Sequence, residues 1–428
     1  MIRFTFAGIL FMLSGLLLAQ QTPANAQSEA ILIKGATAHL GNGQVIENSL
    51  VGFEQGKLTL VAEANSTVDI SRYKQVIEAS GKHLYPGFIA VNTQLGLIEI
   101  DAVRSTRDHT EVGQFNTNIR SLIAYNTDSR VIPTVRSNGI LMAQITPKGG
   151  RISGRSSIVQ LDAWNWEDAA VLADDGIHLN WPTPFSRGAK AGGKNKVLNK
   201  NYSKQVEEVL TFFKEAQGYT SVRKPEQTNL KFEAMRSILD ASRNVYVHAQ
   251  TAKAMLDAIN LLEEFNCRVA IVGGRESWKI TDELKAANVP VLLASTQSLP
   301  RQREVHIDQP FKTSLQLDKA GVLFCFGHRN AWQQRNLPFQ AGQAVAFGLG
   351  YEKAIQGLSL NSAKILGIDQ YTGSIEVGKA ATLFISKGDA LDMRTCKVEK
   401  AFIDGRSINL DNKQEALYRK FKQKYGEE

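Results

Sequence analysis

The sequence predicts a (β/α)₈ barrel that carries a small β-sandwich domain built from both ends of the chain. Near the N-terminus, "ILIKGATAHLGNG" and "SLVGFEQGKLTLVAEA" alternate apolar and polar residues between glycine and asparagine turns, as short strands do. The stretches "GSIEVGKAATLFISKG" and "KVEKAFIDGRSI" repeat this pattern near the C-terminus. Between the two regions, strand-like and helix-like stretches alternate, which predicts a parallel sheet with right-handed crossovers.

The central alternation is clearest from residue 244 onward. The strand "NVYVHAQ" is followed by "TAKAMLDAINLLEEFN", where Ala252, Met255, Ile259 and Leu262 recur at helical spacing. Further strands, "RVAIVGG", "VPVLLAS" and "VLFCFG", are separated by helical patterns. Such units repeated over about 280 residues favour a closed, TIM-like barrel. An open doubly wound sheet is the alternative, but no Gly-x-Gly-x-x-Gly follows an early strand.

Composition and charge restrict the class of protein. The 428 residues are 43% hydrophobic and 21% charged, which is ordinary for a globular chain. The net charge of +8 suits a small acidic substrate or an anionic surface. No nucleic-acid-binding motif is present, so nucleic acid is not an expected partner. The three cysteines, Cys267, Cys325 and Cys396, lie far apart in apolar or strand-like runs, which predicts buried free thiols, with one bridging pair as the alternative.

The first 26 residues have the pattern of a secretory signal peptide. A basic Arg3 precedes an apolar run from Ile9 to Ala19, and Ala24-Asn25-Ala26 forms a small-residue cleavage pattern. The apolar run is shorter than the ~20 residues that span a bilayer. We therefore expect export to the periplasm or outside the cell, and no membrane-spanning segment.

The expected organisation has four parts. The signal peptide covers 1–26, residues 31–86 and 372–410 form the β-sandwich, 87–371 form the barrel, and 411–428 form a C-terminal helix. Within the barrel, residues 186–204 are rich in lysine and contain no acidic residue. This basic insertion is expected to be a mobile, solvated loop, with a basic lid as the alternative.

Three motifs identify a family. "VIEASGKHLYPGFI" closes the first β-segment and enters the barrel, "LSLNSAKILGIDQYTGSIEVGKAATL" leaves it, and "ATLFISKGDALDMRTCKVEKAFIDGR" rebuilds the sandwich. The chain resembles the amidohydrolase superfamily over nearly its whole mature length, and is most similar to exported, imidazolonepropionase-like amidohydrolases. The resemblance implies a hydrolase of carbon–nitrogen bonds, either non-peptide or small dipeptide-like.

The same resemblance implies one or two divalent ions, usually zinc, that activate water at the C-terminal ends of the barrel strands. The family's ligands are a His-x-His on the first strand, a histidine on each of two middle strands and an aspartate on the last. Here the His-x-His falls on Asn92-Thr93-Gln94, and Arg329 stands where the aspartate is expected. Only His248 matches. We therefore expect no tightly held zinc and no other cofactor.

Other polar residues are candidates for a rebuilt site. His248 is a candidate general base, and Arg329 can hold a carboxylate through two hydrogen bonds. Asn92, Gln94, His328 and Arg151 are the other candidate substrate contacts. Replacement carboxylates are offered by the loop residues Glu99, Asp101, Asp108 and Glu111.

Three functional alternatives remain from the sequence. The protein is a hydrolase with a rebuilt site, a catalytically silent relative that binds a ligand, or a companion subunit paired with an active amidohydrolase. A Gly-x-Ser-x-Gly elbow is missing, so a covalent serine hydrolase is disfavoured. In each case the expected ligand is a small, anionic molecule.

The signal peptide generates the first prediction. We expect protein recovered from an exporting host to begin at Gln27, because Ala24-Asn25-Ala26 supplies small residues at the cleavage positions. Intact-mass spectrometry measures this directly. A mature protein that still contained the run from Ile9 to Ala19 would contradict the prediction.

Overall fold

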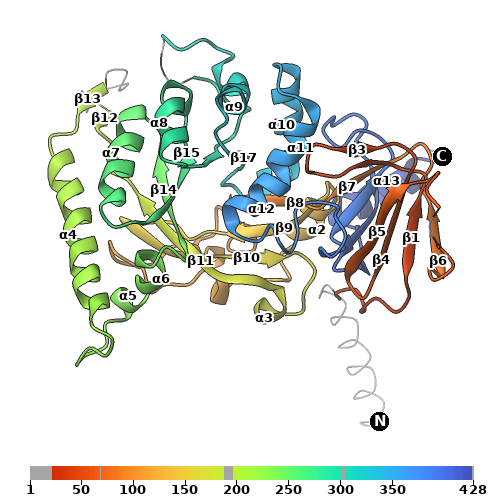
Figure 1. Ribbon diagram of the computed structural model, residues 1–428, viewed down its shortest axis with the longest axis horizontal. Coiled ribbons are helices and arrows are strands. Elements are labelled where there is room, and N and C mark those ends of the chain that lie inside the picture. Colours follow the sequence, from red (N-terminus) through yellow and green to blue (C-terminus); the bar gives the residue numbers. More distant parts are fainter. Residues whose placement is uncertain (1–21, 68, 188–195, 301, 303, 427–428) are drawn as a thin grey trace, which may run out of the picture.

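A nearly closed barrel forms the larger part of the molecule (Figure 1). The computed structural model describes residues 22–67, 69–187, 196–300, 302 and 304–426. Within them, an eight-stranded sheet runs β8-β9-β10-β11-β14-β15-β16-β17, and a parallel bridge from Val91 to Gly327 brings its two edges together. The strands are β8 (Phe88–Thr93), β9 (Ile140–Ile145), β10 (Ile152–Gln160), β11 (Ala170–Asn180), β14 (Asn244–Ala249), β15 (Arg268–Gly273), β16 (Val291–Leu293) and β17 (Phe324–Phe326).

One strand departs from the expected (β/α)₈ pattern. β10 pairs antiparallel with both β9 and β11, whereas the other neighbouring strands of the barrel pair in parallel. The connection from β9 to β10 is too short for a crossover helix, which takes a dozen or more residues. Gly149 and Gly150, at φ +102° and +61°, turn the chain straight back. The barrel is thus confirmed, but strict strand–helix alternation is wrong at this point.

Helices pack around the later strands of the barrel. The apolar face of α7 illustrates the packing: Ala254, Met255, Ala258 and Leu262 are buried against the sheet, and the Thr251 side chain caps the helix by accepting from the Ala254 amide. The helices of this layer are α4 (Tyr202–Ser221), α5 (Leu230–Glu233), α6 (Arg236–Leu239), α7 (Ala252–Glu263), α8 (Thr281–Ala286), α9 (Gln309–Ala320), α10 (Leu337–Ala346), α11 (Tyr351–Leu358) and α12 (Leu360–Leu366). The shorter elements are η2 (Arg104–Thr106), η3 (Leu122–Ala124), α2 (Val131–Arg136), α3 (Trp166–Ala169), η4 (Ser277–Lys279) and η5 (Trp332–Asn336).

Both chain ends contribute to the second domain, as the sequence predicts. A sheet of order β20-β19-β18-β7-β2-β3 faces a sheet of order β5-β4-β1-β6. Phe53 of the second sheet and Phe402 of the first meet in the core between them, with ring centroids 5.0 Å apart. The strands are β1 (Ile31–Lys34), β2 (Thr37–His39), β3 (Val45–Ile46), β4 (Ser49–Glu54), β5 (Lys57–Glu63), β6 (Gln75–Glu78), β7 (His83–Pro86), β18 (Leu383–Ser386), β19 (Val398–Ile403) and β20 (Arg406–Ser407).

Two expectations about surface segments need correction or restriction. The basic insertion 186–204 is not a loop throughout, because β12 (Phe185–Arg187) pairs with β13 (Lys196–Leu198) and α4 begins at Tyr202. Residues 188–195 lie outside the described part of the chain, as do residues 1–21 of the expected signal peptide. In the described ranges, no helix has the length and apolarity needed to cross a bilayer.

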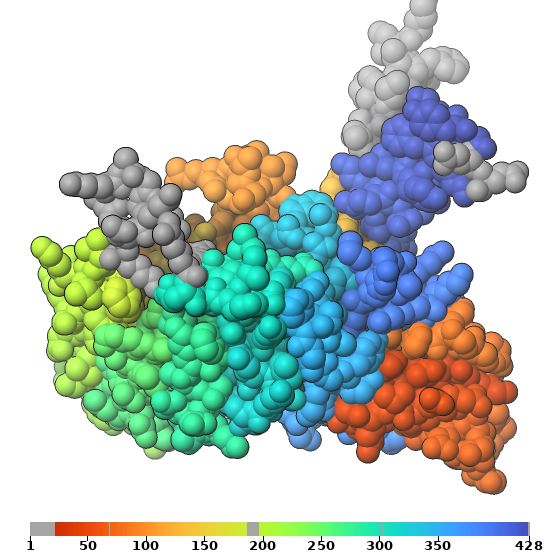
Figure 2. Space-filling view, turned by 90° about the horizontal axis from the view of Figure 1, so that it is seen from above, coloured from red at the N-terminus to blue at the C-terminus, as the bar shows by residue number. Residues whose placement is uncertain are grey.

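The C-terminal segment forms a helix, and the cysteines are free thiols, although only one of them is fully buried. The helix α13 (Lys413–Tyr425) has no buried residue, and the C-terminal segment that contains it projects from the body of the molecule (Figure 2). Cys267, Cys325 and Cys396 are free thiols. Cys325 is buried and the other two are partly buried.

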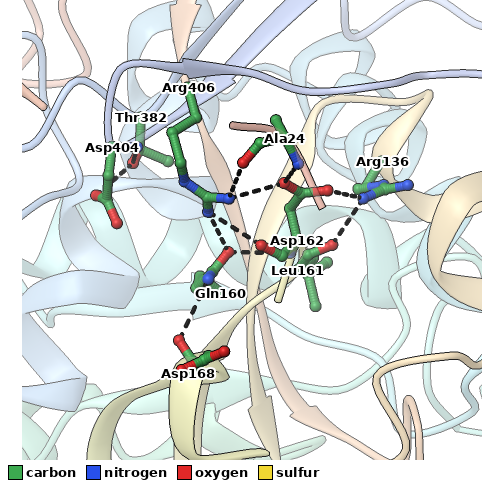
Figure 3. A network of polar contacts seen from close by, with 9 residues as sticks. All are labelled: Ala24, Arg136, Gln160, Leu161, Asp162, Asp168, Thr382, Asp404 and Arg406. Carbon is green, nitrogen blue, oxygen red and sulfur yellow. Dashed lines mark hydrogen bonds and ion pairs between the residues drawn. The ribbon is translucent and has the colours of Figure 1, made fainter. Parts of the chain in front are cut away.

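A buried ionic network fastens the sandwich to the barrel (Figure 3). Asp162, just after β10, contacts Arg136 of α2 at 2.6 Å and Arg406 of β20 at 2.9 Å. Its side chain is 3% exposed, and that of Arg136 is 5% exposed. The amide of Ala24 also donates to Asp162, and Arg406 reaches Gln160. One carboxylate therefore neutralises two cations from separate parts of the chain.

Removal of Asp162 should destabilise the protein strongly. We expect Asp162→Ala to lower the free energy of unfolding by about 3–5 kcal/mol, because it removes a buried carboxylate that pairs with both Arg136 and Arg406. Urea unfolding followed by circular dichroism measures the change. The control is Arg72→Ala, which removes the exposed ion pair with Glu54. It should lower the free energy of unfolding by no more than about 1 kcal/mol. Equal effects of the two substitutions would contradict this account of the network.

Candidate functional site

The candidate site lies at the C-terminal ends of the parallel barrel strands, where barrel enzymes place their chemistry. His248 is the penultimate residue of β14 and is half-buried. It pairs in register with Asn180, the last residue of β11, and with Val272 of β15. The expected position of His248 at a strand end is therefore what the structure shows.

A second histidine, His178 of β11, was missed by the sequence analysis. Its Nδ1 lies 2.9 Å from Nε2 of His248, and its ring is fully buried. The rings of His178 and Tyr246 stack with centroids 4.8 Å apart. The signal was present in "DDGIHLN", which is a strand of the barrel, but the apolar alternation there is interrupted by the two aspartates.

A buried chain of hydrogen bonds continues from His178 into the barrel. Its Nε2 lies 2.8 Å from Oγ of Ser156 on β10, and that hydroxyl donates to Oδ1 of Asp175 at 2.6 Å. The hydroxyl of Tyr246 and the Nε2 amide of Gln144 both donate to Oδ2 of Asp175, at 2.6 and 2.8 Å. Asp175 is thus a buried carboxyl group that receives three hydrogen bonds.

A bulge in β11 makes this convergence possible. The register with β10 moves from Ser156↔Gly176 to Ile158↔Leu172, so the β11 strand carries extra residues at this point. Asp174 sits at φ +54°, in the left-handed region. Asp175 and His178, three residues apart, would face opposite sides of a regular strand, and the irregularity lets both contact Ser156.

The first barrel strand meets the same network through its backbone. The amide of Asn92, a residue at φ +51°, donates to Oε1 of Gln144 at 3.0 Å. The amide of Gln94 donates to the carbonyl oxygen of Arg329 at 3.1 Å. The side-chain atoms Oδ1 of Asn92 and Nε2 of Gln94 are buried and make no hydrogen bond to the described residues. Buried polar atoms are costly without a partner, so these two are available to hydrogen-bond a water molecule or a ligand.

Arg329 supplies positive charge at this end of the barrel. Its side chain forms no ion pair within the described ranges, and burial lowers its pKa. Burial and then the charge of Arg329 lower the pKa of His248 to about 3. Burial, His248 and Arg329 also lower the pKa of His178 well below its usual value. Both imidazoles are therefore neutral at physiological pH.

The remaining sequence candidates lie at the margin of this group. The Nδ1 atom of His328 accepts from the amide of Asn330, and its ring is half-buried. Arg151 donates from Nη1 to the carbonyl of Asn180 at 2.8 Å, which ties it to the end of β11. Three of the loop carboxylates, Asp101, Asp108 and Glu111, are exposed, and Glu99 accepts from Asn126. These candidates do not join the hydrogen-bonded chain.

The donor set does not fit a metal centre. Among the described residues, no three histidine, cysteine, aspartate or glutamate side chains are grouped so that they could hold an ion. Asn92 and Gln94 offer neutral amides, which are weak zinc ligands, and Arg329 opposes a dication by charge. Nδ1 of His178 and Nε2 of His248 already face each other as hydrogen-bond partners. These residues therefore do not form the zinc shell that the family resemblance implies.

Comparison with known proteins establishes the family. The Amidohydrolase family model matches residues 189–408, just over half of the chain. The chain therefore belongs to the amidohydrolase family, whose members are hydrolases. The amidohydrolase tasK of Hapsidospora irregularis is 33% identical over 112 residues, a match that covers 24% of this chain and 11% of that protein. This chain thus spans only a small part of that relative's length.

Solved structures share the fold. An amidohydrolase from Thermotoga maritima MSB8 superposes with a TM-score of 0.75 at 23% identity, over 88% of this chain and 99% of that one. A Xaa-Pro dipeptidase with bound methionine gives a TM-score of 0.55 at 16% identity, over 89% and 99% of the two chains. Molinate hydrolase gives a TM-score of 0.55 at 15% identity, over 90% of this chain and 95% of that one. At these identities, the likeness describes the fold alone.

The donor set generates a prediction about metal. We expect elemental analysis of the purified protein to find well under one zinc per chain, because no complete ligand shell exists. Replacing Arg329 with Asp should raise zinc uptake, since it removes a positive charge and adds a carboxylate beside His248. One or two stoichiometric zinc ions in the unmodified protein would contradict the expectation.

Proposed function

We propose that the protein hydrolyses a carbon–nitrogen bond in a small molecule that bears a carboxylate, without a tightly held metal ion. The observation that carries the proposal is Arg329, a half-buried cation without an acidic partner in the described ranges, next to His248. A guanidinium binds a carboxylate through two parallel hydrogen bonds. Hydrogen bonds to charged groups contribute about 1.5–3 kcal/mol each, so this contact would orient the ligand.

The unpaired amide atoms complement the bond to be cleaved. Nε2 of Gln94 can donate to a carbonyl oxygen, and Oδ1 of Asn92 can accept from an N–H group. An amide group in the ligand contains both a carbonyl oxygen and an N–H group. A bound amide would thus satisfy two buried groups of the first barrel strand, while Arg329 held the carboxylate.

A cavity lined by both apolar and polar residues lies at the ends of two neighbouring barrel strands. It has a volume of about 230 Å³ and lies between the ends of β15 and β16 and the start of α9. Gly273 and Leu293 line it from the strand ends, and Trp278 and Pro310 line it from the surrounding elements. The side chain of Gln250, two residues after His248, packs directly over Gly273. An apolar side chain of the ligand would fit there, as in an N-acyl amino acid or a dipeptide.

Two structural neighbours are consistent with ligands of this size. One solved prolidase is complexed with n-methylphosphonate-l-proline, and one Xaa-Pro dipeptidase contains bound methionine in its active site. Both ligands derive from amino acids. We propose the same broad class of ligand here, and export of the protein through the N-terminal signal peptide.

The second candidate function is a catalytically silent subunit that binds such a ligand, alone or beside an active amidohydrolase. The lowered pKa of His248 favours this candidate, because an imidazole whose pKa is about 3 is a weak base when it acts alone. Both candidates share the anion site at Arg329. They differ in whether the bound amide is cleaved.

Arg329→Met tests the proposed function. We expect the purified protein, with a chelator present, to hydrolyse members of a panel of N-acyl amino acids and dipeptides. Replacing the substrate's carboxylate with a primary amide should lower kcat/KM by about 10- to 100-fold, because the charged hydrogen bonds are lost. Arg329→Met should lower kcat/KM for the carboxylate substrates by a similar factor and leave the neutral analogues little changed.

The matched control is Arg394→Met, which alters an exposed arginine of the sandwich and should leave kinetics unchanged. Calorimetric binding of the panel without turnover would support the silent subunit instead. Hydrolysis that is equally fast with and without the carboxylate would contradict the assignment of Arg329.

A further inference from the structure

We propose that His178, Ser156 and Asp175 form a proton relay that connects His248 to the interior of the barrel, so that a proton accepted at Nδ1 of His248 comes to rest on Asp175. This inference rests on the proposed hydrolysis. It assigns a role to three residues that do not belong to any metal site and do not touch the expected ligand.

The hydrogen bonds around Asp175 determine which of its two oxygens can carry a proton. The backbone amide of Asn92 donates to Oε1 of Gln144, so the other side-chain atom of Gln144 is the NH₂ group that donates to Oδ2 of Asp175. The hydroxyl of Tyr246 accepts from Nδ2 of Asn244, at 2.9 Å, and therefore donates its proton to the same Oδ2. Oδ2 is thus occupied as a double acceptor. A proton on Asp175 must sit on Oδ1, which faces Ser156.

With Asp175 ionised, every hydrogen bond of the chain has one direction. Ser156 donates to Oδ1 of Asp175 and accepts from Nε2–H of His178. Nδ1 of His178 is then an acceptor, so His248 donates to it from Nε2–H. Nδ1 of His248 carries the free lone pair, and it makes no hydrogen bond to the described residues. The ring is only half-buried, so this lone pair is available to a water molecule at the mouth.

Uptake of a proton at His248 exchanges donor and acceptor in every hydrogen bond of the chain. A water O–H bond breaks as an N–H bond forms at Nδ1 of His248, and the Nε2 proton of His248 passes to Nδ1 of His178. The Nε2 proton of His178 passes to Ser156, and the serine proton passes to Oδ1 of Asp175. The hydroxide attacks the carbonyl carbon of the amide. The reverse transfer returns one proton to the departing nitrogen, so protons and charge balance over the cycle.

The relay resolves the difficulty that His248 alone is a weak base. Burial and the charge of Arg329 disfavour an imidazolium at His248, and His178 is equally disfavoured as a cation. Burial raises the pKa of Asp175, although hydrogen bonds from Ser156, Tyr246 and Gln144 and the more distant charge of Arg243 act against it. Burial thus acts in opposite senses along the relay: it disfavours the cationic form of the two rings and favours the neutral form of the carboxyl group.

Asp175→Asn tests the relay through the tautomers of the two histidines. The oxygen of the new amide would accept from Tyr246 and Gln144, and its NH₂ group would donate to Ser156. This substitution therefore fixes the hydrogen bonds in the arrangement that the wild-type chain has after it takes up a proton. Ring-nitrogen ¹⁵N shifts at neutral pH should show Nε2–H on both His178 and His248 in the wild-type protein, and Nδ1–H on both in Asp175→Asn. Asp282→Asn, at an exposed position in the first turn of α8, is the matched control and should leave both tautomers unchanged.

Two further measurements complete the test. In Ser156→Ala, adding Asp175→Asn should no longer change the tautomers, because the connection is cut. Asp175→Asn should lower kcat by about 10²- to 10⁴-fold with little change in KM, since Asp175 is a positioning residue away from the ligand. The wild-type tautomers remain decisive if Asp175→Asn does not fold: Nδ1–H on either ring would overturn the relay.

The outcomes separate the relay from the proposed hydrolysis. Unchanged tautomers in Asp175→Asn would overturn the relay and leave the hydrolysis in place. Reversed tautomers in Asp175→Asn, together with a wild-type protein that turns over no substrate, would overturn the hydrolysis and retain the direction of the hydrogen bonds.

Discussion

The carboxyl group of Asp175 constrains the rest of the site. It lies inside the barrel, and no described residue forms an ion pair with it. A buried charge of this kind is tolerated only when hydrogen bonds replace water. Gln144, Ser156 and Tyr246 supply them from strands β9, β10 and β14. Two consecutive strands, β9 and β10, and the distant strand β14 are thereby hydrogen-bonded to one carboxyl group.

The surrounding geometry follows from these bonds. Gln144 extends the network to the backbone of Asn92, which places the first strand's amide side chains at the mouth. The hydrogen bond to Ser156 orients the ring of His178, and the hydrogen bond between the two rings orients His248. The antiparallel course of β10 contributes here, since it brings Ser156 opposite the bulge of β11. The hydrogen-bonded chain thus begins at His248, which matches a metal ligand of the family, and continues through residues that the resemblance does not assign to metal.

Arg329 acts on this chain from the outside. In a metal-dependent relative, this position carries an acid that works beside a dication. Burial is the main cause of the lowered pKa of both imidazoles, and the guanidinium of Arg329 adds to it. The change at Arg329 and the amides at Asn92 and Gln94 are electrostatically consistent with one another. Under the proposed function, these residues replace a site that attracts cations with one that attracts a carboxylate.

Much of the fold follows from the sequence, because its signals are local. Flanking motifs and strand–helix alternation predict the barrel and the two-ended sandwich, and the substitutions at Asn92, Gln94 and Arg329 predict a changed site. The antiparallel β10 was not predicted, since a strand's direction depends on its partners. His178, Ser156 and Asp175 were missed for a related reason. Their convergence depends on a bulge and on pairing between strands, which no single stretch of sequence records.

The central claim is that a carboxylate, and not zinc, occupies the barrel mouth. Its most direct test is diffraction from crystals soaked with N-acetylglycine and zinc chloride together, recorded at the zinc absorption edge. The account predicts density for the carboxylate against Arg329 and no anomalous peak between His178 and His248. A strong anomalous peak bound by both imidazoles, with Arg329 turned away, would contradict it.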